Sequence, residues 1–133
     1  MSRGLRNNNP GNIRRSSAHY KGEVRPSRDK EFKEFQSMAY GYRAMFVLLD
    51  TYRRRYGLNT LRTMLMRYAP PTENYTSTYI DFVSQRTGIG TDTPLDTHHR
   101  RDMVPTVAAM SEMENGVPAN WNDVEAGWEM FVG

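Results

Sequence analysis

Glu114 is the residue of this sequence whose type and position most favour acid–base chemistry. At about 100° per residue along an expected helix, Glu114 falls about 20° from Met103, in the same apolar stripe as Val107. Glu112 falls about 180° from Met103, on the face that solvent would cover. Burial first, and the negative end of the helix dipole second, should raise the pKa of a carboxyl group placed at Glu114. Such a group is protonated near neutral pH and can act as a general acid.

Two structural interpretations of Glu114 stay open at this level. The helix could end before Glu114, so that the side chain reaches solvent, or the carboxylate could pair with an arginine without any role in chemistry.

Three further clusters of polar residues are candidates for function. His98 and His99 are adjacent, so their rings would diverge by about 100° on a helix, and with no cysteine in the chain we expect no metal site and no cofactor. The arginine run 53–55 falls at the end of an expected helix, where positive charge suits the helix dipole, and this favours a structural role over nucleic-acid binding. Segment 68–76 carries aromatic and amide groups that could bind a sugar or could simply cap a helix.

The hydrophobic pattern predicts a mainly α-helical α+β protein with a small β-hairpin. Residues 18–36 are typical of a short hairpin with a turn at 25–29, and the Asn-rich segment 7–12 is typical of a loop. The six residues before Asn7 are too few for us to expect a helix there.

Five helices are expected from capping residues and apolar spacing. They follow caps at Ser37, at Thr60, at Asn74 or Thr76, at Asp102 and at Asn120, and the first four end at Gly57, before Pro70-Pro71, at Gly88 and at Asn115-Gly116. On the last helix, the shared stripe of Trp121, Val124, Trp128 and Phe131 predicts a core face with no part in ligand binding.

The composition indicates a soluble protein with one domain spanning residues 1–133. The chain is 38% hydrophobic and 25% charged. It has too many aromatic residues for a disordered protein and is too polar for insertion into a membrane. The absence of cysteine excludes disulfides and a thiol nucleophile. Residues 1–70 carry 15 Lys/Arg and 5 Asp/Glu, whereas residues 71–133 carry 3 and 10, so the first half is an arginine-rich surface suited to planar anions.

Several segments together resemble a family of small phage-encoded proteins that are labelled virion structural or lytic proteins. The resemblance extends through Glu114-Asn115-Gly116 and is carried by Arg3-Gly4-Leu5-Arg6-Asn7-Asn8-Asn9-Pro10-Gly11-Asn12-Ile13-Arg14, by Gly22-Glu23, by Phe32-x-x-Phe35-x-Ser37, by Gly41-Tyr42-Arg43-Ala44 and by Tyr68-Ala69-Pro70-Pro71-x-Glu73-Asn74-x-Thr76-x-x-Tyr79-Ile80. That family is similar to the lysozyme-like superfamily of lytic transglycosylases, muramidases and endolysins. The resemblance implies a single lysozyme-like domain.

The order of the motifs differs from that of the superfamily's flagellar-type glucosaminidases. In those enzymes a helix ending in the catalytic Glu comes first, followed by an Asn-rich stretch, a Trp-x-Gly and an aromatic pair. Here 9–14, 20–22 and 32–37 resemble the later pieces in that order, while the helix ending in Glu114 lies near the C-terminus. The resemblance therefore implies a circularly permuted arrangement, with loop 7–12 packed near the C-terminal end of the Glu114 helix.

The activity implied is cleavage of the bond between N-acetylmuramic acid and N-acetylglucosamine in peptidoglycan, with Glu114 as the acid. A hydrolase needs a second carboxylate, for which Glu23 and then Glu34 are the candidates, whereas a transglycosylase needs only one. The residues expected to bind the sugar are Asn9, Asn12, Tyr40, Glu73, Asn74 and Tyr79.

Two other functions are carried as alternatives. The chain could be a virion-associated structural or cell-wall-binding protein that lacks the acid, or the arginine-rich half could bind nucleic acid, which is the less favoured of the two. The expected partner is bacterial peptidoglycan, with no metal. The polar N-terminus has no signal peptide, so we expect synthesis in the bacterial cytoplasm and action at the cell wall, as part of a virion or at lysis.

Overall fold

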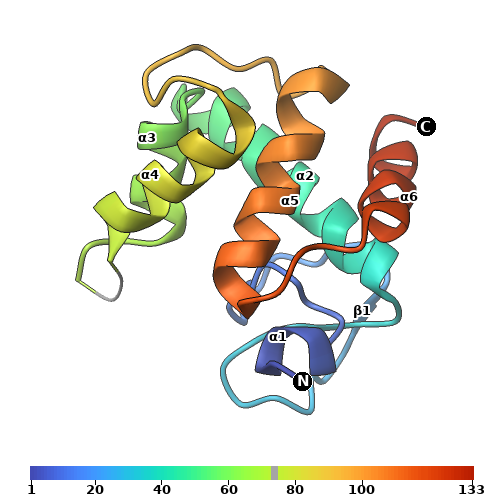
Figure 1. The fold of residues 1–133 in the computed structure, drawn as a ribbon. Coiled ribbons are helices and arrows are strands. Elements are labelled where there is room, and N and C mark those ends of the chain that lie inside the picture. Colours follow the sequence, from blue (N-terminus) through green and yellow to red (C-terminus); the bar gives the residue numbers. More distant parts are fainter. Residues whose placement is uncertain (73–74) are drawn as a thin grey trace.

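A computed structural model describes residues 1–72 and 75–133, which are mainly helical with a small two-stranded antiparallel sheet (Figure 1). The elements in chain order are α1 (Arg3–Arg6), β1 (Glu23–Val24), β2 (Glu34–Phe35), α2 (Met38–Tyr56), α3 (Leu61–Tyr68), α4 (Thr76–Thr87), α5 (Arg100–Asn115) and α6 (Trp121–Val132). The predicted class, mainly α with a short hairpin, is confirmed.

Most helix ends lie where the capping residues predict them. The side chain of Ser37 accepts from the Tyr40 amide at the start of α2, and Gly57 ends α2 with a left-handed φ of 68°. The side chains of Thr60 and Asn120 cap α3 and α6 in the same way.

Three of the predicted helix starts are wrong. The chain does form a helical turn before Asn7, because the Ser2 side chain caps α1. The N-cap of α4 is Tyr75, which makes no side-chain cap bond, and Thr76 donates instead to the Ala69 carbonyl. Helix α5 begins before Asp102, whose carboxylate accepts from the Asp96 amide.

The long helix α2 packs most extensively against α6, and α4 packs against both α3 and α5 (Figure 1). Gly127 allows the close approach of α6, since a Cβ there would lie 2.8 Å from the Arg43 amide nitrogen. The ring of Trp128 meets Phe46 edge to face with 5.0 Å between centroids.

The predicted core face of α6 is only partly confirmed. Val124 and Trp128 are buried and Phe131 is half-buried, but Trp121 is 54% exposed. Side chains of a helix lean toward its N-terminus, so the first position of α6, which Trp121 occupies, has no preceding turn to cover it, and this accounts for its exposure.

Candidate active site

The Asn-rich loop 7–12 is held in place by Asn9. Its side chain is wholly buried, donates to the carbonyl oxygens of Ile13 (3.0 Å) and Lys33 (2.9 Å), and accepts from the Ile13 amide (3.0 Å). Each amide atom of Asn9 is therefore used within the protein. The prediction that Asn9 binds sugar is corrected, because this side chain fixes the shape of the loop and has no exposed surface to offer a ligand.

The loop lies against the C-terminal end of α5, as predicted (Figure 1). Asn115 donates to the Pro10 carbonyl at 2.8 Å and accepts from the Ser2 hydroxyl at 2.7 Å. Asn12 donates through Nδ2 to Oε1 of Glu114 at 2.9 Å, and its φ of 48° is the left-handed conformation that asparagine tolerates. Residues about 100 positions apart in sequence are thus joined by direct hydrogen bonds.

Glu114 is half-buried, and burial raises the pKa of its carboxyl group. The Asn12 amide, the Tyr79 hydroxyl and the charge of Arg14 oppose that rise only in part. Glu112, about half a turn away around the same helix, instead forms an ion pair with Arg86 at 2.9 Å. The sequence correctly predicted the direction and first cause of the Glu114 pKa shift.

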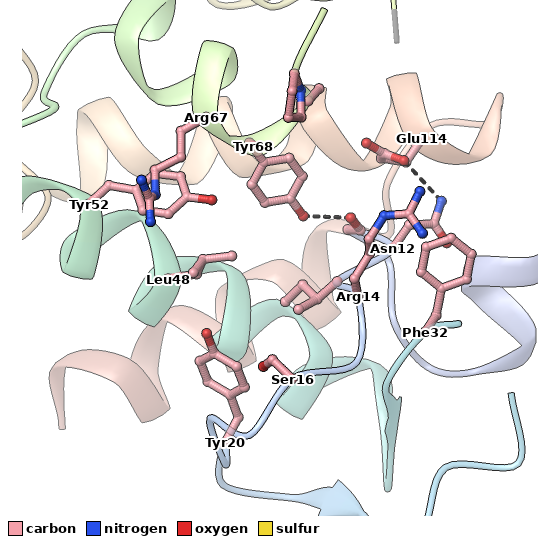
Figure 2. A pocket seen from close by; sticks show the side chains of 14 residues that line it. Asn12, Arg14, Ser16, Tyr20, Phe32, Leu48, Tyr52, Arg67, Tyr68 and Glu114 are labelled. Carbon is pink, nitrogen blue, oxygen red and sulfur yellow. Dashed lines mark hydrogen bonds between the residues drawn. The ribbon is translucent and has the colours of Figure 1, made fainter. Parts of the chain in front are cut away.

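Glu114 lies at one side of an open cleft of about 340 Å³ between loop 11–16, α2 and the end of α3 (Figure 2). The other labelled side chains that line the cleft are mostly aromatic or cationic: Asn12, Arg14, Ser16, Tyr20, Phe32, Leu48, Tyr52, Arg67 and Tyr68. Aromatic faces with a few polar groups are the usual lining of a site for sugars or other small ligands. Glu114 is the only acidic side chain of the cleft lining within 1–72 and 75–133.

Two tyrosines connect the site to the helices around it. The Tyr68 hydroxyl donates to the Gly11 carbonyl at 2.5 Å, joining the end of α3 to the loop. The Tyr79 hydroxyl is 3.5 Å from the Met110 carbonyl oxygen and also interacts with the Glu114 carboxylate. Burial raises the pKa of both phenols, so both stay neutral. Tyr79 is 4% exposed, so it supports Glu114 and does not offer the sugar-binding surface that we predicted.

The predicted second carboxylates lie elsewhere and are already paired. Burial opposes ionisation of Glu23, but hydrogen bonds from Arg25, the Tyr20 amide and Lys33 outweigh it, and the pKa is lowered. The Arg28 side chain lowers the pKa of Glu34. Glu23 lines a separate cavity of about 400 Å³, and Glu34 lines neither cavity. We correct both assignments, because neither carboxylate lines the cleft with Glu114 and each is paired with a cation outside it.

Tyr40 also lies outside the cleft. It packs over Gly22, where a Cβ would come within 2.2 Å of the Tyr40 ring. Gly22, the residue before β1, has a φ of 79°, which glycine tolerates, and its lack of a side chain lets the Tyr40 ring pack directly on its backbone. Tyr40 is thus a packing residue, and Glu73 and Asn74 lie outside the described residues.

Of the predicted sugar-binding residues that the structure describes, Asn12 is the one that lines the cleft with Glu114. Sequence reasoning missed Tyr20, Tyr52, Arg14 and Arg67 as cleft residues. A usable signal was present at Tyr52, because a tyrosine on the apolar stripe of a helix needs a polar or wet place for its hydroxyl.

The structural interpretation of the arginine run is supported by two of its three members. Arg53 pairs with Asp96 at 3.1 Å and Arg54 with the buried Asp50 at 2.8 Å. Within 1–72 and 75–133 there is no group of three or more side chains arranged to hold a metal ion. No described helix is both long and apolar enough to cross a bilayer.

No family model matches the chain. It is similar to Protein P5 of Pseudoalteromonas phage PM2, with 39% identity over 133 residues, an alignment that covers 96% of this chain and 81% of that protein.

Proposed function

The chain belongs to the family of Protein P5 of Pseudoalteromonas phage PM2, and we propose that it is a phage peptidoglycan-lytic enzyme with a lysozyme-like fold. Its substrate is the glycan of the bacterial cell wall, and the bond cleaved joins N-acetylmuramic acid to N-acetylglucosamine. Glu114 is the general acid, and neither a metal nor a cofactor takes part.

The observation that carries this proposal is the environment of Glu114. Its carboxyl group borders an aromatic-lined cleft, has a pKa raised by burial, and is oriented by the Asn12 amide at 2.9 Å. A raised pKa favours the protonated form of a carboxyl group, and that form beside a binding cleft is what proton donation to a leaving oxygen needs.

The single described carboxylate in the cleft favours a lytic transglycosylase over a two-carboxylate hydrolase. Glu114 gives its proton to the glycosidic oxygen as the bond to the anomeric carbon breaks. The resulting carboxylate takes the proton from the 6-hydroxyl of the muramic acid as that oxygen bonds to the anomeric carbon. The products are a 1,6-anhydro end and a free hydroxyl, and Glu114 regains its proton.

The aromatic side chains supply the sugar-binding surface. Tyr20, Tyr52 and Phe32 line the cleft from three different segments, and the Tyr68 ring lies between Arg67 and Glu114 in the view of Figure 2. Flat rings of this kind can pack against the apolar faces of successive pyranose units.

The contact between loop 7–12 and α5 supports a circularly permuted lysozyme-like arrangement. A helix ending in the acid and an Asn-rich stretch are joined here by the Asn12–Glu114 and Asn115–Pro10 hydrogen bonds, although they are at opposite ends of the chain. Segments that are consecutive in flagellar-type glucosaminidases are therefore neighbours in space.

The test compares Glu114→Gln with Glu112→Gln in clearing of purified sacculi. Glutamine keeps the shape of the side chain and removes the ionisable proton. We expect Glu114→Gln to lose at least about 10²-fold in activity while thermal unfolding is unchanged or slightly higher, and Glu112→Gln to keep activity. Full activity of Glu114→Gln would move the acid elsewhere, and cell-wall binding by an inactive wild type would establish a binding protein.

A further inference from the structure

Arg67 differs from the other arginine of its helix in how it is held. Arg62 forms a two-point ion pair with Asp92, through Nε at 2.8 Å and Nη2 at 3.2 Å. Arg67 has no carboxylate partner within 1–72 and 75–133. Its guanidinium lies 3.9 Å from the ring centroid of Tyr56 and 5.4 Å from that of Tyr52.

Stacking on aromatic rings leaves the N–H edge of a guanidinium available. The five donors lie in its plane, and a carboxylate can accept two of them in parallel from the open edge. The rings also limit the rotamers of the long side chain, so less conformational entropy is lost when an anion binds.

Arg67 lines the same cleft as Glu114, at its other end in the view of Figure 2. The second cation of the cleft, Arg14, stacks on Phe32, pairs with Glu31 at 3.5 Å and acts electrostatically on Glu114. Arg67 is therefore the cation placed to meet a charged group of the ligand away from the reacting bond.

The two common kinds of glycan strand differ in charge. Chitin-type strands of N-acetylglucosamine are neutral, whereas each N-acetylmuramic acid carries a lactyl group, with a carboxylate when free or a carboxylate-bearing peptide when substituted. An open-edged arginine offset from the acid along the strand would distinguish the two.

We propose that Arg67 binds a carboxylate carried on the lactyl side of N-acetylmuramic acid, which makes the ligand of this cleft an anionic glycan and not a chitin-type strand. This inference rests on the proposed function for its glycan substrate. It adds the specificity-determining residue and the charge of the ligand.

The test measures calorimetric affinity in a Glu114→Gln background, so that no ligand is consumed. The probes are peptide-bearing glycan chains, the same chains after amidase treatment, and neutral chitohexaose. The added variants are Arg67→Gln, Arg67→Lys and the control Arg62→Gln, which removes a cation of the same helix outside the cleft. Circular dichroism checks that each variant is folded.

We expect Arg67→Gln to weaken binding of peptide-bearing chains by about tenfold or more and of chitohexaose much less, with Arg67→Lys in between and Arg62→Gln within about twofold. A loss on the amidase-treated chains alone identifies the lactyl carboxylate, which is an amide in the peptide-bearing chains, and a loss on the peptide-bearing chains alone identifies a stem-peptide carboxylate. A loss on both charged probes shows that Arg67 accepts either carboxylate. Unchanged binding of charged chains, equal losses on charged and neutral probes, or no binding of any probe would overturn the inference. Sacculus cleavage by the wild type is measured separately, so Arg67-dependent binding without cleavage would overturn the enzymatic proposal alone.

Discussion

Glutamate side chains in two parts of this molecule have pKa shifts of opposite sign. In the hairpin, Glu23 and Glu34 are buried against cations, and the pKa of each carboxyl group is lowered. At the end of α5, Glu114 is half-buried against an amide and phenols, and its pKa is raised. Burial opposes ionisation in both places, so the nature of the nearest partner decides whether the carboxyl group is a counter-ion or an acid.

The largest effect should come from breaking the hairpin pair. Lys33 is 1% exposed, and its ammonium group donates to both oxygens of Glu23 at 3.1 Å. Glu23→Gln leaves that buried charge poorly compensated, so we expect a loss of about 3 kcal/mol in the free energy of unfolding, measured by urea denaturation.

The double variant Glu23→Gln, Lys33→Met is the control for that loss. Removing both charges should recover much of the stability, since a buried ion pair costs desolvation that an apolar side chain avoids. A Glu23→Gln protein of wild-type stability would show that the pair is not structural. A Glu23→Gln protein that stays folded but loses lysis would return Glu23 to the catalytic site.

The next effect is on chemistry. Glu114→Gln should lower lysis by at least about 10²-fold, whereas Glu34→Gln should leave the activity per folded molecule within about twofold. If Glu34→Gln instead abolished lysis in a folded protein, the division into counter-ions and acid would be wrong.

A smaller effect should follow from removing the amide that orients Glu114. Asn12 has a φ of 48°, so Asn12→Gly removes the side chain without backbone strain. The Asn12 hydrogen bond lowers the pKa of Glu114, so its loss should move the alkaline limb of the activity profile to higher pH and reduce activity about two- to tenfold.

Asn8→Gly is the matched control for Asn12→Gly. Asn8 has a φ of 51° and donates to the Phe35 carbonyl, away from Glu114. Its pH profile should keep the wild-type position, and an equal displacement in both variants would assign the effect to the loop in general.

The smallest expected effect is on the pH dependence of stability, to which Glu114 and Glu23 contribute with opposite signs. A raised pKa means that the folded protein holds the proton more tightly, so the Glu114 contribution to stability falls as pH rises from about 4.3 through the folded pKa. A lowered pKa has the opposite sign, so the Glu23 contribution falls as pH drops from about 4.3 through the folded pKa.

Urea denaturation across this range measures both contributions. Glu114→Gln should remove the loss on raising pH, and Glu23→Gln should remove the loss on lowering it. The same dependence on pH in both variants would contradict the comparison.

The sequence predicted what local periodicity and capping determine. Ser37 and Gly57 bound α2 as expected, and the angular position of Glu114 gave its burial and the direction of its pKa shift. The family resemblance supplied the one long-range contact, between loop 7–12 and the end of α5.

Pairing between side chains is what the sequence did not predict. Glu23 meets Lys33 only because the hairpin register brings them together, and that register is not visible in composition or spacing. Arg67 of α3 meets Tyr52 and Tyr56 of α2 through the packing of two separate helices, which residue spacing along the chain does not show either. Trp121 was predicted in the core but is exposed, because the period of a helix does not show whether its first turn has a packing partner.

The measurement that tests the central claim most directly is mass spectrometry of muropeptides released from purified sacculi by the wild type and by Glu114→Gln. We predict 1,6-anhydromuropeptides from the wild type and none from the variant. Reducing muramic acid ends would show that water is the acceptor and would contradict the one-carboxylate mechanism. Freed stem peptides, or the same products from both proteins, would contradict the assignment of Glu114 as the acid that cleaves the glycan.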